Sequence, residues 1–114
     1  MLKNNVLRKN KDFSLIYKKG KSVGDRFVVL FYRPNGLTYN RTGFLASKKV
    51  GNSVIRHHIT RLVREAYRLH EEMFNSGLDI VVIARATARE IGYHEVESAI
   101  LHLGRLQGIV NKES

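Results

Sequence analysis

The stretch "KKVGNSVIRHHITRLVREAYR", residues 48–68, leads from a basic turn into a helix with two unlike sides. Its apolar side chains recur every three or four residues, which is the spacing of one helical face. This apolar stripe consists of Ile55, Ile59, Leu62, Ala66, Leu69 and Met73. The pattern predicts a helix that is capped by Asn52 or Ser53 and ends at "NSG", residues 75–77.

The opposite side of this helix is strongly basic. At about 100° per residue, one cationic strip faces away from the apolar stripe and consists of His57, Arg61, Arg64 and Arg68. Glu65 is the only acid in the stretch, and it can offset the charge of Arg61 four residues earlier. Because the other charges are unbalanced, the strip favours a bound phosphate backbone over the alternative of a solvated surface.

The turn before the helix is a second candidate for anion binding. Lys48 and Lys49 are expected to end a strand, and Gly51 permits a tight turn into the helix. Backbone N–H groups at a helix N-terminus favour anions. The segment lacks the second glycine and the Gly-Lys-Ser/Thr ending of a nucleotide-hydrolase phosphate loop.

The charge of the whole chain indicates the same kind of partner. The 114 residues carry a net charge of +10, and residues 1–68 hold sixteen Lys and Arg against three Asp and Glu. This clustering favours nucleic acid, and no amphipathic helix has the aromatic insertion face that membrane binding needs. Cysteine is absent, which excludes disulfides and thiolate chemistry. Without a secretory signal or a long apolar run, we expect a cytoplasmic protein of one domain, residues 1–114.

The hydrophobic pattern of the remaining chain predicts a small α+β sandwich, with helices packed on one sheet. The predicted strands are 26–33, 42–49 and 78–85, with a weaker one at "KSV", residues 21–23. The other predicted helices are 10–19 and 93–110. Both alternating sets of side chains in the strand at 26–33 are apolar, so both faces of the sheet should be at least partly covered.

Four apolar side chains near the N-terminus are candidates for a second RNA contact. Phe13 and Tyr17 lie one turn apart on the first helix, and Val29 and Phe31 share one face of the first long strand. If helix and strand are neighbours, these side chains can form a stacking platform for single-stranded nucleotides. Ordinary core packing is the alternative explanation.

The sequence contains no set of side chains with the spacing of a catalytic or metal site. His57 and His58 are adjacent and therefore point about 100° apart on a helix, which is unsuited to holding one metal ion. An HExxH metal motif and a GxSxG nucleophile motif are both absent. We therefore expect no catalytic residue, no metal ligand and no cofactor held by the chain's own side chains, and we infer an RNA-binding protein.

Residues 47–68, "SKKVGNSVIRHHITRLVREAYR", resemble the signature of the bacterial ribonuclease P protein subunit, Lys-Lys-x-Gly-Asn-Ala-Val-x-Arg-Asn-Arg-x-Lys-Arg-x-x-Arg-Glu. The similarity extends to "LRKNKDFSLIYKKGKSV", "RFVVLFY", "LDIVVIAR" and "LHLGRL", and so covers nearly the whole chain. It implies the element order αβββαβα with a left-handed βαβ crossover, which departs from the usual right-handed preference.

The resemblance also implies a function and a set of functional residues. The family's subunit joins a catalytic RNA that hydrolyses the 5′ leader from precursor tRNA, using Mg²⁺ held by the RNA. It contacts both the catalytic RNA and the leader. The positions matching the family's RNA contacts are Lys48, Lys49, Gly51, Asn52, Arg56, Arg61 and Arg64, to which we add His57, His58 and Arg68 of the basic helix. The positions matching its leader-binding cleft are Phe13, Tyr17, Val29 and Phe31.

The basic helix departs from the family signature at four positions. Ser53 replaces Ala, and Thr60 stands where Lys is usual. His57 and His58 replace Asn and Arg. Two fixed charges of the signature are therefore lost: the Lys replaced by Thr60, and the Arg replaced by His58, because histidine is mostly neutral at neutral pH. Two alternative functions remain. One is a small basic RNA-binding protein of ribosomal type. The other is a stand-alone RNA nuclease, but the sequence lacks the catalytic clusters that such an enzyme needs.

Overall fold

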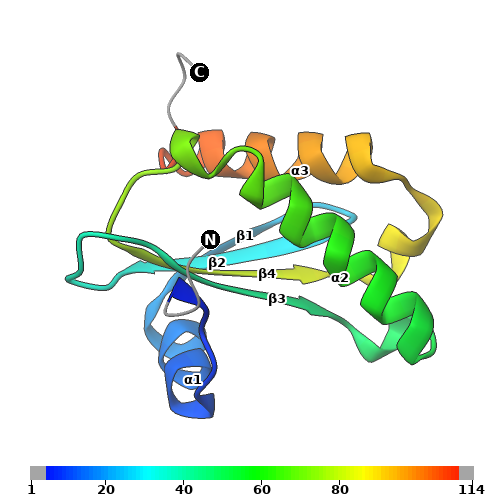
Figure 1. The fold of residues 1–114 in the computed structure, drawn as a ribbon, viewed down its shortest axis with the longest axis horizontal. Helices are drawn as coiled ribbons and strands as arrows, with labels where there is room; N and C mark the ends of the chain where they lie inside the picture. Colours follow the sequence, from blue (N-terminus) through cyan, green and yellow to red (C-terminus); the bar gives the residue numbers. More distant parts are fainter. Residues whose placement is uncertain (1–4, 111–114) are drawn as a thin grey trace.

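Helices cover both faces of a single sheet (Figure 1). In this computed structural model, which describes residues 5–110, three α-helices and a four-stranded sheet follow in the order αβββαβα. The helices are α1 (Asn10–Lys19), α2 (Ser53–Arg68) and α3 (Tyr93–Leu106), and the strands are β1 (Lys21–Gly24), β2 (Val28–Pro34), β3 (Arg41–Ala46) and β4 (Leu78–Ala84). Short 3₁₀ helices between them are η2 (Lys48–Val50), η3 (Glu71–Met73) and η4 (Ala86–Glu90). The predicted α+β class and element order are confirmed, including the weak strand, which is β1.

The sheet is mixed, and its strand order is β1-β2-β4-β3. Strand β2 pairs antiparallel with both β1 and β4, whereas β3 and β4 are parallel. Parallel neighbours need a crossover connection, and α2 supplies it between the end of β3 and the start of β4. The expected β-α-β crossover is therefore present, and its left hand stays a prediction from the resemblance.

The two faces of the sheet are covered to different extents. Figure 1 shows α2 and α3 on one side of the sheet and α1 on the other. Along β2, Leu30 is fully buried in the large core beneath α2 and α3. The next residue, Phe31, points to the α1 side and is only partly buried, beside a small core of Leu7, Ile16 and Val81. Both faces are covered as predicted, but only one is closed.

Helix α2 is shorter than its apolar spacing predicted. It ends at Arg68 instead of continuing to "NSG", because the chain turns at Leu69 toward η3. Leu69 belongs to the predicted apolar stripe but is 55% exposed, while Val63 and Tyr67 are buried in its place. After Arg68 the chain no longer follows the helix, so the helical period no longer predicts which side chains are buried.

Helix α3 also ends earlier than predicted, at Leu106 instead of residue 110. Gly108 has a φ of 72°, a backbone conformation that glycine adopts readily. The N–H of Ile109 then donates to the carbonyl of Gly104 at 3.0 Å, which closes the helix end. The chain therefore turns back toward the core, where Ile109 is buried.

A buried carboxylate links β4 to its neighbours. Asp79 is 1% exposed, and its two oxygens accept hydrogen bonds from Arg41 of β3 at 2.9 and 2.7 Å. The amide of Asn35 donates to the same carboxylate at 3.0 Å, and Asp12 of α1 lies 3.8 Å from the Arg41 guanidinium. This network holds α1 and the β2–β3 loop in place against the parallel pair of strands.

Candidate nucleic-acid interface

The turn between β3 and α2 leaves two lysines exposed. The Ser47 hydroxyl accepts a hydrogen bond from the N–H of Lys49 at 3.2 Å, so the predicted strand ends at Ala46 and η2 follows. Lys48 and Lys49 are exposed on this turn. Gly51 has a φ of 157°, and a Cβ there would lie 3.0–3.1 Å from three atoms of a helix side chain, so glycine permits the close turn.

The first turn of α2 carries positive charge and no acid. The Asn52 side chain accepts a hydrogen bond from the N–H of Ile55 at 3.0 Å, which confirms Asn52 as the cap. Arg56 is partly buried, and its Nε has no hydrogen-bond partner among residues 5–110. The positive end of the helix dipole adds to the local field, so this end of α2 suits an anionic ligand.

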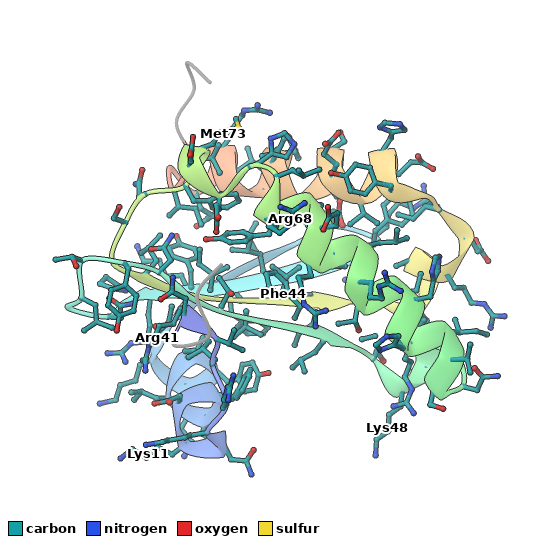
Figure 2. The ribbon with its side chains drawn as sticks, in the orientation of Figure 1. Lys11, Arg41, Phe44, Lys48, Arg68 and Met73 are labelled. Atoms are coloured by element: carbon teal, nitrogen blue, oxygen red, sulfur yellow. The ribbon has the colours of Figure 1, made fainter. Side chains whose placement is uncertain are left out.

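The outer side of α2 presents the predicted cationic strip. The buried residues of the helix are Ile59, Val63, Ala66 and Tyr67. The strip residues His57, Arg61, Arg64 and Arg68 are all exposed, as is His58. In Figure 2, Lys48 and Arg68 mark the two ends of this basic stretch. The helical period thus separated the buried and basic sides of α2 correctly.

One arginine of the strip is paired within the helix. Glu65 accepts hydrogen bonds from the Arg68 guanidinium at 3.0 and 2.5 Å. This bonding lowers the pKa of Glu65 and raises the pKa of Arg68. Glu65 was expected to pair with Arg61, but it pairs with Arg68 instead. Arg68 lies three residues later in the chain and reaches both carboxylate oxygens. Arg61 and Arg64 form no ion pair within the described part of the chain.

On the other face of the sheet, α1 and β2 bring three aromatic rings together. The ring of Tyr17 lies 5.0 Å from that of Phe31 and 6.4 Å from that of Phe13, between ring centres. Tyr17 is 41% exposed, and its partial burial raises the pKa of its hydroxyl. Val29 lies on the same side of β2 as Phe31 and is partly buried. The four predicted residues therefore share one partly open surface.

A cavity of about 330 Å³ at the outer edge of β3 joins this surface to the strip. Gly43 lets β3 approach α1, since a Cβ there would lie 2.8 Å from the ring of Phe13. The lining combines apolar side chains with arginines, among them Phe13, Phe44, Leu45, Arg8, Arg64 and Arg68. The sequence did not indicate Arg8, Phe44 or Leu45, because only the docking of the N-terminal segment on Thr42 brings Arg8 beside β3.

A second basic hollow lies where β3 and β4 end. Parallel strands end at the same edge of a sheet, so Lys49 after β3 comes near Arg85 after β4. With Arg26 they line a cavity of about 410 Å³. Arg85 donates to the carbonyl of Asp25 at 3.0 Å, and the Thr87 hydroxyl donates to the carbonyl of Arg26. Arg85 could not be found from the sequence, because its position depends on the strand order.

The histidine and carboxylate contacts near α3 are structural. His70 lies 2.8 Å from the Glu97 carboxylate, and Tyr93 donates to the same carboxylate at 3.2 Å. The hydrogen bond with His70 lowers the pKa of Glu97. Within residues 5–110 no group of three or more His, Asp or Glu is placed to hold a metal ion. The helices in that range lack the length and apolar character needed to cross a membrane.

These features define a class of small, basic α+β proteins, in which a cationic crossover helix and an aromatic sheet surface meet at one edge. A family model described as Ribonuclease P matches residues 1–106. The ribonuclease P protein component of Alkaliphilus metalliredigens is 46% identical over 111 residues, covering 97% of this chain and 100% of that protein. The chain therefore belongs to the bacterial ribonuclease P protein component family.

Solved structures agree with this assignment. The Staphylococcus aureus RNase P protein has a TM-score of 0.85 at 34% identity, covering 94% of this chain and 98% of that one. The RNase P protein of Thermotoga maritima has a TM-score of 0.79 at 36% identity, covering 87% and 94%. The chain is thus a protein subunit of ribonuclease P, which processes the 5′ end of precursor tRNA together with its RNA subunit. Membership implies association with that RNA and decides against the ribosomal-type and stand-alone nuclease alternatives.

Proposed function

We propose that the subunit binds two RNA segments at once, on surfaces that meet at β3. In this proposal the catalytic RNA binds the turn and outer side of α2, through Lys48, Lys49, Gly51, Asn52, Arg56, His57, His58, Arg61, Arg64 and Arg68. The single-stranded 5′ leader binds the aromatic surface formed by Phe13, Tyr17, Val29 and Phe31. The observation that carries the proposal is the cavity at the β3 edge, where Phe13 and two arginines of α2 line one space.

The chemistry of the two surfaces suits these two roles. Unpaired arginines on α2 can neutralise phosphates, and each neutralised phosphate releases counterions, which drives binding at moderate salt. Arg68 contributes less than Arg61 and Arg64, since Glu65 already offsets its charge. The exposed ring of Tyr17 can stack on any base, at about 1–3 kcal/mol per base. Such contacts suit a leader of variable sequence.

The protein's contribution to cleavage is binding and charge neutralisation. In our proposal the RNA subunit holds the Mg²⁺ ions and carries out the hydrolysis. The protein lowers the phosphate repulsion between the catalytic RNA and its substrate, and it holds the leader in place. It should therefore reduce the Mg²⁺ concentration that cleavage requires, because protein cations replace part of the screening by metal ions.

A cleavage assay at low Mg²⁺ tests this function. Precursor tRNA is incubated with the protein alone, with the catalytic RNA alone, and with both. We expect cleavage only when both are present, and activity should be lost on prior ribonuclease treatment of the holoenzyme. Cleavage by the protein alone after such treatment would contradict the proposal, as would an absence of stimulation of the cognate RNA.

The leader contact has a separate test. Affinity of the holoenzyme is measured for precursor tRNA with leaders of increasing length and for mature tRNA. We expect the protein to increase affinity for precursor only when the leader is long enough to reach the aromatic surface. Equal enhancement for mature tRNA would show that the protein does not hold the leader.

A further inference from the structure

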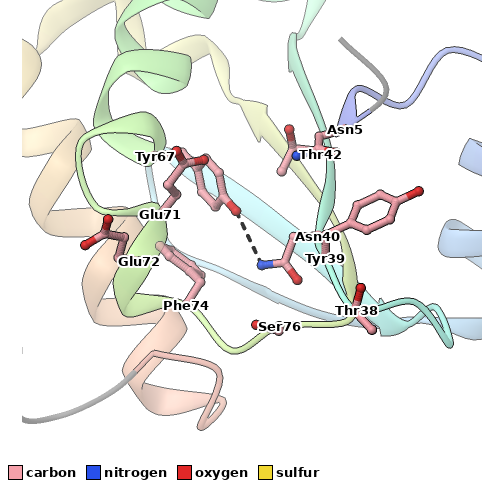
Figure 3. A pocket seen from close by; sticks show the side chains of 10 residues that line it. All are labelled: Asn5, Thr38, Tyr39, Asn40, Thr42, Tyr67, Glu71, Glu72, Phe74 and Ser76. Carbon is pink, nitrogen blue, oxygen red and sulfur yellow. Dashed lines mark hydrogen bonds between the residues drawn. The ribbon is translucent and has the colours of Figure 1, made fainter. Parts of the chain in front are cut away.

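A polar cavity of about 630 Å³ opens beside the C-terminal end of α2 (Figure 3). It lies between η3, the loop before β3 and the start of β3 itself. Among the residues that the structure describes, no Lys or Arg lines it, although the chain carries a net charge of +10. A cavity of this composition is poorly suited to phosphate, and it stands outside the two surfaces assigned above.

One wall of the cavity carries a hydroxyl donor that is held in position. Tyr67 is 2% exposed, and its hydroxyl accepts a hydrogen bond from the Asn40 amide at 3.4 Å (Figure 3). Asn40 is itself fixed, since it also donates to the carbonyl of Asn75 and accepts from the N–H of Leu78, both at 2.8 Å. Burial raises the pKa of the Tyr67 hydroxyl, so it keeps its proton and can donate to a ligand.

The same side of the cavity carries a carboxylate acceptor. Glu71, in η3, is partly buried and lines the cavity, and Figure 3 places it beside the ring of Tyr67. Its carboxylate has no hydrogen-bond partner among residues 5–110. Arg68, which interacts with it electrostatically, is already bonded to Glu65. Glu72 also lines the cavity, but it is exposed and in Figure 3 its side chain points away from the Tyr67 hydroxyl. Glu71 and Tyr67 thus offer an acceptor and a donor to whatever enters the cavity.

The cavity lies next to the proposed RNA-binding groove. Thr42 lines both this cavity and the one at the β3 edge, which Arg64 and Arg68 border. A strand whose phosphates lie on α2 can therefore direct a base into the cavity. A carboxylate near a polyanion is favourable only where it accepts hydrogen bonds from N–H groups, and unpaired bases present such groups on their Watson–Crick edges.

We propose that this cavity binds an unpaired guanine base of the RNA held on α2. The Watson–Crick edge of guanine carries two N–H donors beside one carbonyl acceptor. Glu71 accepts from N1–H and the N2 amino group, and Tyr67 donates to O6. Uracil fits poorly because its single N–H is flanked by two carbonyls that repel the carboxylate, and adenine lacks a donor at N1. The proposal rests on the RNA-binding function proposed above and adds a base preference to it.

Paired nucleotides test the proposal on the full-length chain. GMP and inosine 5′-monophosphate differ only in the N2 amino group and have the same phosphate, so surface charge affects both alike. Binding is followed by NMR shifts of the backbone amides of residues 67–72 and by calorimetry. We expect GMP to bind about tenfold more tightly, because only GMP has the N2 amino group as a second donor to the Glu71 carboxylate.

Two substitutions should change this preference in different ways. Glu71→Gln should remove most of the difference between GMP and inosine monophosphate, whereas Tyr67→Phe should weaken both nucleotides about equally because both carry O6. Glu71→Gln also makes the chain more positive, so a purely electrostatic effect would tighten both nucleotides instead. The control Glu90→Gln, on the exposed η4, adds the same charge away from the cavity and should leave the preference unchanged. Thermal unfolding monitors whether Tyr67→Phe loosens the fold.

Two results would overturn the proposal. One is equal binding of GMP and inosine monophosphate to the unaltered chain. The other is a response of the amides near Glu71 to spermidine but not to GMP, which would make the cavity a cation site. The precursor-tRNA assay separates these results from a failure of the RNA-binding function. If the unaltered chain and Glu71→Gln both stimulate the catalytic RNA, that function stands whatever the nucleotide result.

Discussion

On one face of the sheet, α2 and α3 bury Leu30 completely, whereas on the other face α1 leaves the neighbouring Phe31 partly exposed. The two residues are adjacent on the same strand and alternate across it. The closed face collects most of the buried apolar residues, while the α1 face has a small core and exposes Tyr17. The closed face therefore stabilises the fold, and the partly open face leaves apolar rings available to a ligand.

The largest expected effect is a loss of stability when a side chain buried on the closed face is truncated. Leu30→Ala should lower the free energy of unfolding by about 3 kcal/mol, because it leaves a cavity in a fully buried site. Phe31→Ala, one residue along, should cost less because its ring is already partly in contact with water. Urea unfolding of both variants measures the difference. Equal losses would mean that the two faces contribute alike to stability.

Helices α2 and α3 both close this face, but α2 carries the cationic strip on its outer side. Removing two arginines from α2 tests whether this strip binds RNA. The double variant Arg61→Ala/Arg64→Ala should weaken binding to the catalytic RNA roughly 25-fold at physiological salt, about fivefold per lost phosphate contact. The slope of log K against log salt should become shallower by about 1.4 to 1.8. Stability should change little, since both side chains are exposed.

The matched control removes two exposed arginines near α3. Arg89→Ala/Arg105→Ala changes the net charge by the same amount, on η4 and on the last turn of α3. We expect only a small loss of affinity and an unchanged salt slope. If this control weakened binding as much as the α2 variant, net charge rather than the strip would be responsible.

The open face should respond to truncation of its exposed ring. Tyr17→Ala should weaken binding of precursor tRNA about tenfold, through the loss of one stacked base. Its effect on unfolding should stay below about 1 kcal/mol, because the side chain is 41% exposed. Leu106→Ala, at an exposed apolar position of α3, serves as the control. Unchanged affinity for precursor tRNA in the Tyr17 variant would remove this ring from the leader site.

The smallest expected effect is a pH dependence on the closed face. Glu97 has a lowered pKa, first through its hydrogen bond with His70, so its contribution to stability is present above the ordinary value of 4.5 and is lost as pH falls through the lowered value. Glu97→Gln should therefore cost about 0.5–1 kcal/mol near pH 5, and the cost should shrink as the pH is lowered toward 3. Urea unfolding at both pH values measures this. A cost that is the same at both would rule out this explanation.

The local features of α2 could be predicted because they depend on contacts within one helix. Asn52 caps the helix, and the side opposite Ile59 is basic, as expected. The prediction failed at Leu69, where the chain turns and the helical period no longer applies. The partner of Glu65 was also missed, because positions three and four residues away are both within reach and side-chain geometry decides between them.

The sequence by itself determined the class of fold, the family and the charge pattern, since periodicity, capping and a long motif are all properties of contiguous residues. Only the tertiary structure decided which distant residues share a surface. The rings of Tyr17 and Phe31 meet because α1 packs on β2, and Lys49 meets Arg85 because β3 and β4 are parallel neighbours. The cavity of Glu71 and Tyr67 arises because α2 ends at Arg68 beside the loop before β3. Such contacts depend on strand order and helix ends, which are set by packing across the whole core rather than by local sequence.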